Sequence, residues 1–170
     1  MNDHQLRLKA AIAKAIDQDN VSLLALDEIE AANYPDAICE ELTRKFGTLK
    51  AKTLIEGAHC GKLGKISHIL KEGFKKSLSL SEFSRLHDQI NPHVRCFVED
   101  NSLYLVYPRC YCPHVKNLKL ALPEVWCQCT KGYVKEIYGY IFNKEINPLL
   151  IESIKMGSDK CLIRIDLCLD

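Results

Sequence analysis

The chain has 170 residues, a length that fits one domain of common size with a buried core. Hydrophobic residues make up 47% of it, with 8 glycines and 6 prolines, and this composition excludes intrinsic disorder and a fibrous repeat. The formal net charge is +1 at pH 7, so no overall charge excess directs the chain toward a polyanion or a polycation.

The charge is nevertheless uneven along the chain. Residues 43–78 carry nine basic and two acidic side chains. Aromatic residues, on which nucleic-acid bases would stack, are nearly absent from this stretch, so nucleic acid is not an expected partner. The first residues are polar without a secretory h-region, and no apolar run approaches the ~18 residues of a membrane span. We therefore expect a soluble, cytoplasmic protein with no membrane partner.

The first 92 residues predict a series of helices. Pro35 suits the first turn of one of them and Gly47 its end, while Ser79 with Glu82 forms a capping box before another. The helices expected from the spacing of apolar residues are 6–16, 21–32, 35–46, 49–56, 66–74 and 83–90.

After Asn91 the apolar residues alternate, which is the period of strands. A helix follows, capped by Thr130, in which Gly132 allows a close backbone approach. The expected elements are a hairpin of 94–98 and 103–107, a cysteine loop, a helix over 131–142, and a second hairpin of 146–154 and 161–167. The order predicts a single α+β domain over 1–170. Its helical part, 1–92, would pack on an antiparallel sheet of about four strands within a cysteine-rich part, 93–170.

Nine cysteines without a secretion signal argue against a disulfide framework. Two Cys-x-Cys pairs and one later cysteine form the shortlist of metal ligands, which is Cys110, Cys112, Cys127, Cys129 and Cys161. In an extended chain residues i and i+2 point the same way, so each pair has the spacing to chelate one zinc ion. Two other interpretations stay open: reduced thiols with one reactive cysteine, and a redox disulfide between the two pairs.

Other cysteines have simpler interpretations. Cys39, Cys96 and Cys168 are expected to be packing residues, because free cysteine is often buried. Cys60 lies beside His59, and the glycines on both sides of it would expose it. A His-Cys dipeptide alone is a weak sign of catalysis, since neighbours in sequence rarely face each other.

Several segments of the C-terminal half carry a family resemblance. They are Cys127-x-Cys129-Thr-x-Gly-Tyr133, the following helix with Gly139, a strand with Glu152-Ser-Ile154, and Gly157-x-Asp-x-Cys161-x-Ile-x-Ile165. Over roughly residues 94–168 they resemble vinyl-reductase-type small-molecule-binding domains. They are more similar still to the bacterial families grouped with L-2-amino-thiazoline-4-carboxylic acid hydrolase.

The resemblance implies a fold like the ligand-binding domains of nitric-oxide signalling and Golgi-transport proteins. It also implies a pocket for small ligands beside a zinc held by cysteines and a glutamate. Cys161 matches the last zinc cysteine of that pattern, but the two preceding ligand positions hold Ser153 and Leu150. Either cysteines of the two Cys-x-Cys pairs replace them, or the site is free of metal.

Three functional hypotheses follow. The first is a small-molecule-binding domain with a structural zinc, whose pocket is lined by Tyr133, Ile137 and Tyr138. The second is a hydrolase of small cyclic amide or thiazoline-like C–N bonds. Its nucleophile would be Cys112 or Cys129, with His114 as base. The third is an interaction protein that forms a homodimer through its helices.

Overall fold

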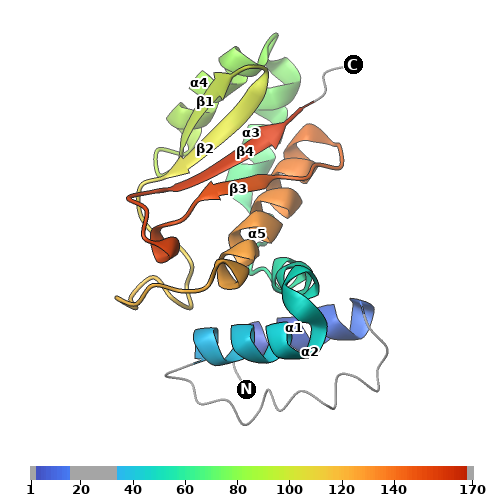
Figure 1. The fold of residues 1–170 in the computed structure, drawn as a ribbon. Coiled ribbons are helices and arrows are strands. Elements are labelled where there is room, and N and C mark those ends of the chain that lie inside the picture. Colours follow the sequence, from blue (N-terminus) through green and yellow to red (C-terminus); the bar gives the residue numbers. More distant parts are fainter. Residues whose placement is uncertain (1–2, 16–33, 168–170) are drawn as a thin grey trace. The chain divides into compact units, whose positions relative to one another are not determined.

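The computed structural model describes residues 3–15 and 34–167 (Figure 1). The helix expected over 21–32 and Cys168 lie outside these residues. By its internal contacts the chain divides into two compact units. Unit 1 consists of Met1–Cys60 and Cys112–Gly132, and unit 2 of Gly61–Tyr111 and Tyr133–Asp170. These boundaries differ from the expected division at residue 92, because each unit combines an earlier and a later segment of the chain.

Unit 2 contains the predicted sheet, and the α+β fold class is confirmed. The four strands are β1 (Arg95–Glu99), β2 (Ser102–Tyr107), β3 (Leu149–Glu152) and β4 (Cys161–Asp166). They pair antiparallel in the order β1-β2-β4-β3, so the two hairpins meet where β2 lies beside β4 (Figure 1).

The first hairpin is closed by a tight turn. Glu99 pairs with Ser102, and the two residues between them, Asp100 and Asn101, have φ values of 47° and 60°. Two consecutive positive φ angles are typical of a type I′ turn, whose twist matches that of the strands it joins. The predicted hairpin and its turn are confirmed.

The second hairpin is also present, but β3 is shorter than the predicted strand over 146–154. The strand begins only after Pro148, which has no backbone N–H to donate to a ladder. It ends before Ser153, whose hydroxyl accepts a hydrogen bond from the amide of Lys155 and starts the 3-10 helix Ile154–Met156. Gly157, with φ 98°, then turns the chain toward β4.

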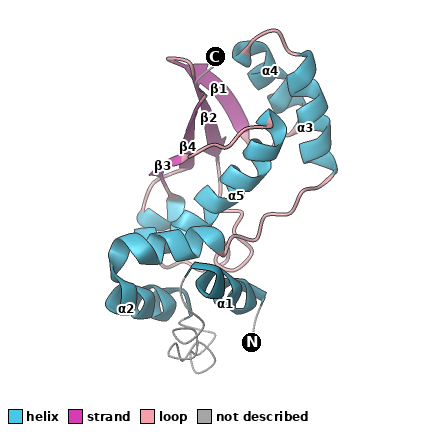
Figure 2. Ribbon diagram, turned by 90° about the vertical axis from the view of Figure 1, so that its right-hand side faces the viewer, coloured by secondary structure: helices cyan, strands magenta, loops and turns pink. Residues whose placement is uncertain are grey.

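Helices cover one face of this sheet. They are α3 (Lys65–Lys76), α4 (Leu80–Ile90) and the later part of α5 (Glu124–Phe142), as Figure 2 shows. Alternate residues of the strands point toward them, and Leu105 and Ile163 are fully buried there. The helices expected over 66–74 and 83–90 are confirmed with slightly wider bounds. The Ser79 hydroxyl caps α4 by accepting from the amide of Glu82, as predicted.

Unit 1 contains α1 (Asp3–Ala15), α2 (Tyr34–Gly57) and the first part of α5. The backbone of α2 leaves the helical conformation at Gly47, where φ is 76° and ψ 160°. This break separates the two helices predicted over 35–46 and 49–56. Tyr34 meets Trp126 of α5 edge to face, with ring centroids 5.8 Å apart.

The start of α5 corrects the prediction of a helix over 131–142. The helix begins at Glu124, directly after Pro123, whose carbonyl accepts from the amide of Trp126 at 3.0 Å. Thr130 therefore lies inside the helix and is not its cap. Cys127 and Cys129 are helical residues, and the extended geometry assumed for their pair does not apply. None of the helices in the described ranges has the length and apolar character that crossing a membrane requires.

Gly132 provides a first test of the packing within unit 1. A Cβ atom at this position would lie 2.0 Å from the carbonyl oxygen of Glu56 in α2. The predicted close approach is confirmed, and Gly132→Ala should lower the free energy of unfolding by about 1–3 kcal/mol or more. Gly64→Ala is the matched control, because no atom lies within 4 Å of its added Cβ. Equal urea midpoints for the two variants would contradict this close packing.

A buried polar pair tests the core of unit 2. The hydroxyl of Tyr138 shares a hydrogen bond of 2.7 Å with Nε2 of the fully buried His87, and burial lowers the pKa of this imidazole. Tyr138→Phe leaves that nitrogen without its partner and should cost about 1–3 kcal/mol of stability. Tyr140→Phe removes an exposed hydrogen bond to His68 and should cost under about 0.5 kcal/mol. Thermal unfolding of both variants measures the difference.

Candidate functional site

Three cysteines from three segments of the chain meet in unit 1, and we refer to Cys60, Cys112 and Cys129 as the thiol cluster. Cys60 follows the end of α2, Cys112 lies in the loop before α5, and Cys129 belongs to α5 itself. The thiol of Cys129 is hydrogen-bonded to the sulfurs of both other cysteines. Cys129 is buried with 4% exposure, whereas Cys60 and Cys112 are half-buried.

Arg7 links the segments that carry Cys60 and Cys112. From α1 its Nε donates to the carbonyl of Ala58 at 3.3 Å, two residues before Cys60. One terminal nitrogen contacts Nε2 of His114 at 3.3 Å, two residues after Cys112, and the other pairs with Asp3. The guanidinium, with its fixed fork of donors, therefore bridges the segment before Cys60 and the segment after Cys112.

Cys112 begins a tight turn. Its carbonyl accepts hydrogen bonds from the amides of Val115 and Lys116, at 3.2 and 2.9 Å. Backbone amides of His114 and Val115 also hydrogen-bond to its sulfur. Because N–H donors stabilise a negatively charged sulfur, this turn is a local environment that favours a thiolate.

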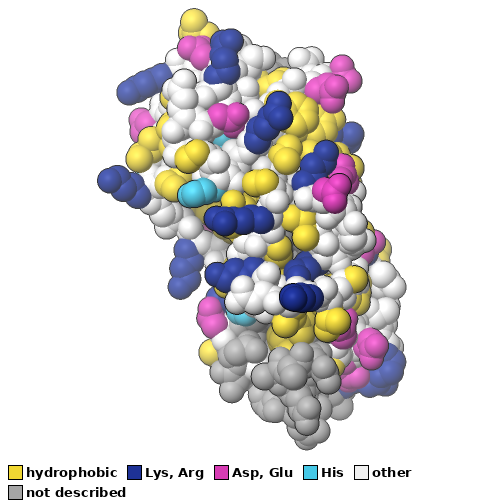
Figure 3. Space-filling model, turned by 90° about the vertical axis from the view of Figure 1, so that its left-hand side faces the viewer, with side chains coloured by type: hydrophobic (Ala, Val, Ile, Leu, Met, Phe, Trp, Pro, Cys, Tyr) yellow, Lys and Arg dark blue, Asp and Glu magenta, His cyan; other side chains and the backbone are white. Residues whose placement is uncertain are grey.

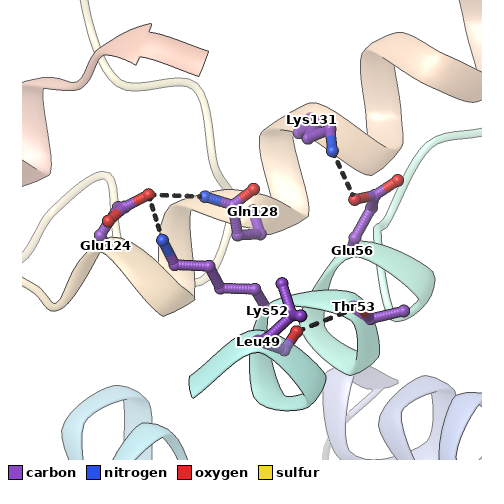
Figure 4. Close-up of polar contacts among 7 residues, drawn as sticks. All are labelled: Leu49, Lys52, Thr53, Glu56, Glu124, Gln128 and Lys131. Carbon is purple, nitrogen blue, oxygen red and sulfur yellow. Dashed lines mark hydrogen bonds and ion pairs between the residues drawn. The ribbon is translucent and has the colours of Figure 1, made fainter. Parts of the chain in front are cut away.

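Two ion pairs join α5 to the second part of α2, as Figure 4 shows. Lys52 contacts Glu124 at 2.6 Å, and Glu124 also accepts from the side-chain amide of Gln128. Lys131 contacts Glu56 at 3.0 Å, close to the backbone approach at Gly132. Each pair is partly exposed and contributes little stability alone, but both join α5, which carries Cys129, to the second part of α2.

The hydrogen bonds divide the protons of the cluster unequally. Hydrogen bonding to Cys129 lowers the pKa of Cys60 to about 6, and the positive charge of Arg7 acts in the same direction. Hydrogen bonding to Cys129 also lowers the pKa of Cys112 to about 7, although a charge on Cys60 opposes this. The same two bonds and burial raise the pKa of Cys129 well above its usual value. At neutral pH Cys129 is therefore protonated. As the pH rises, Cys60 loses its proton before Cys112.

His114, the predicted base, lies against Arg7. Burial and the nearby guanidinium lower its pKa, so the imidazole is neutral at pH 7. Because the guanidinium only donates, Nε2 of His114 accepts from it and is engaged there. Among the described residues, the group that donates a hydrogen bond to the sulfurs of Cys60 and Cys112 is therefore the thiol of Cys129, and not His114.

The second Cys-x-Cys pair does not act as a chelating pair. In an α-helix, side chains two residues apart point about 200° away from each other, so one ion cannot take both Cys127 and Cys129. Cys127 is buried near Cys39 of α2, and burial raises the pKa of Cys39 to about 12. These two are packing thiols, as predicted for Cys39.

The remaining predicted ligands belong to unit 2. Cys161 is buried at the start of β4, where its sulfur accepts from the amide of Ile154 at 3.4 Å, and Cys110 is half-buried after β2. Over residues 3–15 and 34–167, no group of three or more His, Cys, Asp or Glu side chains has an arrangement suited to a metal ion. The five shortlisted cysteines do not fit the zinc site that the resemblance implies, and zinc binding stays a prediction.

The predicted pocket residues also lie in unit 2. Ile137 and Tyr138 are part of its hydrophobic core, and Tyr133 packs against that core. Their role in binding a ligand stays a prediction, because what the structure provides for them is packing and the hydrogen bond of Tyr138 to His87.

Much of the basic stretch is neutralised locally. Arg44 and Lys45 both pair with Glu41, Lys75 pairs with Glu72, and Lys71 lies over the ring of Tyr140. Figure 3 shows basic and acidic side chains interspersed over one face of the molecule. These contacts and the mixed surface charges are typical of solvated helix faces.

Residues 9–169 match the model of a family of unknown function, DUF6144. The chain belongs to this family. The DUF6144 match spans segments of both units and therefore includes Cys60, Cys112 and Cys129. No curated protein and no solved structure matches the chain.

Arg7 is the first residue whose replacement tests the electrostatics of the cluster. Arg7→Gln removes a positive charge that favours the Cys60 thiolate, so the pKa of Cys60 should rise above about 6. The midpoint of the pH–rate profile for Cys60 alkylation, followed by peptide mass spectrometry, measures this. Arg7→Lys keeps the charge and should shift the midpoint less.

Arg44→Gln is the control, because Arg44 pairs with Glu41 in the first part of α2. The pH–rate profile for Cys60 alkylation in this variant should coincide with that of the wild-type protein. Equal midpoints for Arg7→Gln and Arg44→Gln would contradict the proposed action of Arg7 on Cys60.

Proposed function

We propose that the protein is a thiol-dependent enzyme whose nucleophile is the Cys60 thiolate. The observation that carries this proposal is the hydrogen-bonded arrangement of Cys60, Cys129 and Cys112 in unit 1. The thiolate, and not the thiol, is the nucleophile of cysteine enzymes, and a neighbouring group must stabilise it at neutral pH. Here the Cys129 thiol acts as the hydrogen-bond donor, and Arg7 supplies a positive charge.

The environments of the three thiols support different roles. Cys129 is buried and retains its proton, so it is a donor and not the attacking group. Cys112 ionises after Cys60, because the charge on Cys60 raises the pKa of Cys112. Cys60 is half-buried, so it is the more accessible partner of the buried Cys129. Cys60 therefore replaces Cys112 and Cys129 as the first candidate.

Differential alkylation tests this assignment. With iodoacetamide at pH 7, Cys60 should be labelled faster than the buried Cys39 and Cys96, and its pH–rate profile should have a midpoint near 6. Cys129→Ala removes the stabilising donor. The midpoint should then move toward the ~8.5 of a free cysteine. Labelling at pH 7 should slow about two- to threefold, because the higher nucleophilicity of the more basic thiolate offsets much of the loss in thiolate fraction.

Cys127→Ala is a closely matched control, because it removes a buried thiol from the same helix two residues away. It should leave the Cys60 profile unchanged. Uniformly slow labelling of all cysteines in the original protein would overturn the proposal.

A metal ion bound to the thiols would also slow their labelling. This outcome can be distinguished from a lack of reactive thiols. Elemental analysis of protein purified without a metal-affinity tag, with labelling before and after treatment with a chelator, identifies it. Faster labelling after metal removal would support the predicted zinc, whereas the free thiolate proposed for Cys60 predicts equal rates and no bound metal.

A further inference from the structure

We infer that the thiol cluster reacts with small-molecule disulfides, and that Cys129 is the resolving thiol that closes a Cys60–Cys129 disulfide. This inference rests on the proposed role of Cys60 as nucleophile. Its basis is geometric: the sulfur of the second thiol is hydrogen-bonded to the sulfur of the first. Sulfurs joined by a hydrogen bond are direct neighbours, and a disulfide between them would have an S–S length of ~2.05 Å.

The exchange balances with the groups of the cluster. The Cys60 thiolate attacks one sulfur of a disulfide RSSR, an S–S bond forms to Cys60, and the RS⁻ that leaves takes the Cys129 proton. The Cys129 thiolate then attacks the Cys60 sulfur and expels the second RS⁻, which takes a proton from solvent. RSSR is reduced by two electrons to two RSH, and Cys60 and Cys129 are oxidised to a disulfide. Small thiols regenerate the dithiol by the reverse exchange.

The location of the proton favours this chemistry over attack on carbon. In thiol–disulfide exchange the resolving group must be a second thiol beside the nucleophile, protonated at first and close enough to attack. Buried Cys129 meets both conditions. Hydrolysis of an acyl-cysteine would instead need an oriented water and its base, but Nε2 of the expected base His114 is engaged by Arg7.

Cys112, the third thiol of the cluster, can also form a disulfide with Cys129, so every expected disulfide includes Cys129. Cys112 and Cys60 are both hydrogen-bonded to Cys129. After a Cys60–Cys129 disulfide has formed, the Cys112 thiolate is placed to attack the Cys129 sulfur and to release Cys60. A Cys112–Cys129 disulfide is therefore a second product, whereas Cys127 and Cys39 take no part.

The test treats the reduced full-length protein with bis(2-hydroxyethyl) disulfide, quenches it with acid and N-ethylmaleimide, and maps disulfides by peptide mass spectrometry. The original protein and Cys127→Ala should lose two hydrogens and contain a disulfide that includes Cys129. Cys129→Ala should stop at a stable mixed disulfide on Cys60. Cys60→Ala should abolish the Cys60–Cys129 product. Cys112→Ala should still form it.

The outcomes separate this inference from the function on which it rests. Rapid iodoacetamide labelling of Cys60 together with a persistent mixed disulfide, or no exchange, would overturn the disulfide chemistry and favour a carbon electrophile such as the predicted C–N bond. A disulfide that omits Cys129 would also overturn it. Slow labelling of Cys60 in the same preparation would instead overturn the proposed function itself.

Discussion

The close approach of α5 to the end of α2 decides where the thiols of unit 1 meet. At Gly132 the absence of a side chain lets the α5 backbone reach the carbonyl of Glu56, and any Cβ there would overlap that oxygen. The pairs Lys131–Glu56 and Lys52–Glu124 hold the same contact from its two sides. With α5 held this way, Cys129 faces Cys60 just beyond the end of α2, and the thiol cluster depends on this packing.

The cluster combines burial with charge in a way that single cysteines do not. A lone buried thiol such as Cys39 becomes harder to ionise, because burial disfavours the charged form. Cys129 is equally buried, but its proton is shared with two partners that are closer to solvent. Burial thus keeps the proton on one sulfur, and the resulting hydrogen bonds stabilise negative charge on the others. Arg7, held by Ala58, His114 and Asp3, adds a positive charge that favours the Cys60 thiolate.

Unit 2 has the character of a structural scaffold with one polar pair in its core. Its sheet is covered on one face by helices, and the pair His87–Tyr138 satisfies two buried polar groups at once. The residues expected to line a ligand pocket are core residues of this unit or pack on its core. The thiol chemistry proposed for unit 1 uses none of them.

Local sequence patterns determined most of the secondary structure. The period of two around the Asp100-Asn101 turn, the break at Gly47 and the cap at Ser79 all follow from short-range sterics and hydrogen bonding, which a single sequence displays. The start of α5 differs from the predicted one, because Thr130 resembles a cap whereas the helix begins at Glu124, directly after Pro123. That error assigned an extended geometry to Cys127 and Cys129 and suggested a chelating pair.

By itself the sequence determined the fold class, the strands and the presence of many free cysteines, and it indicated a close approach at Gly132. Only the tertiary structure decided which cysteines meet. Cys60 lies 52 residues before Cys112, and Cys129 lies 17 residues after it, and no local pattern relates residues so far apart. These three cysteines meet because α5 packs on α2 and because Arg7 contacts the segments near Cys60 and Cys112. The turn of the helix directs Cys129, and not Cys127, toward them. The partners of a thiol, and with them its pKa, are properties of packing and not of sequence spacing.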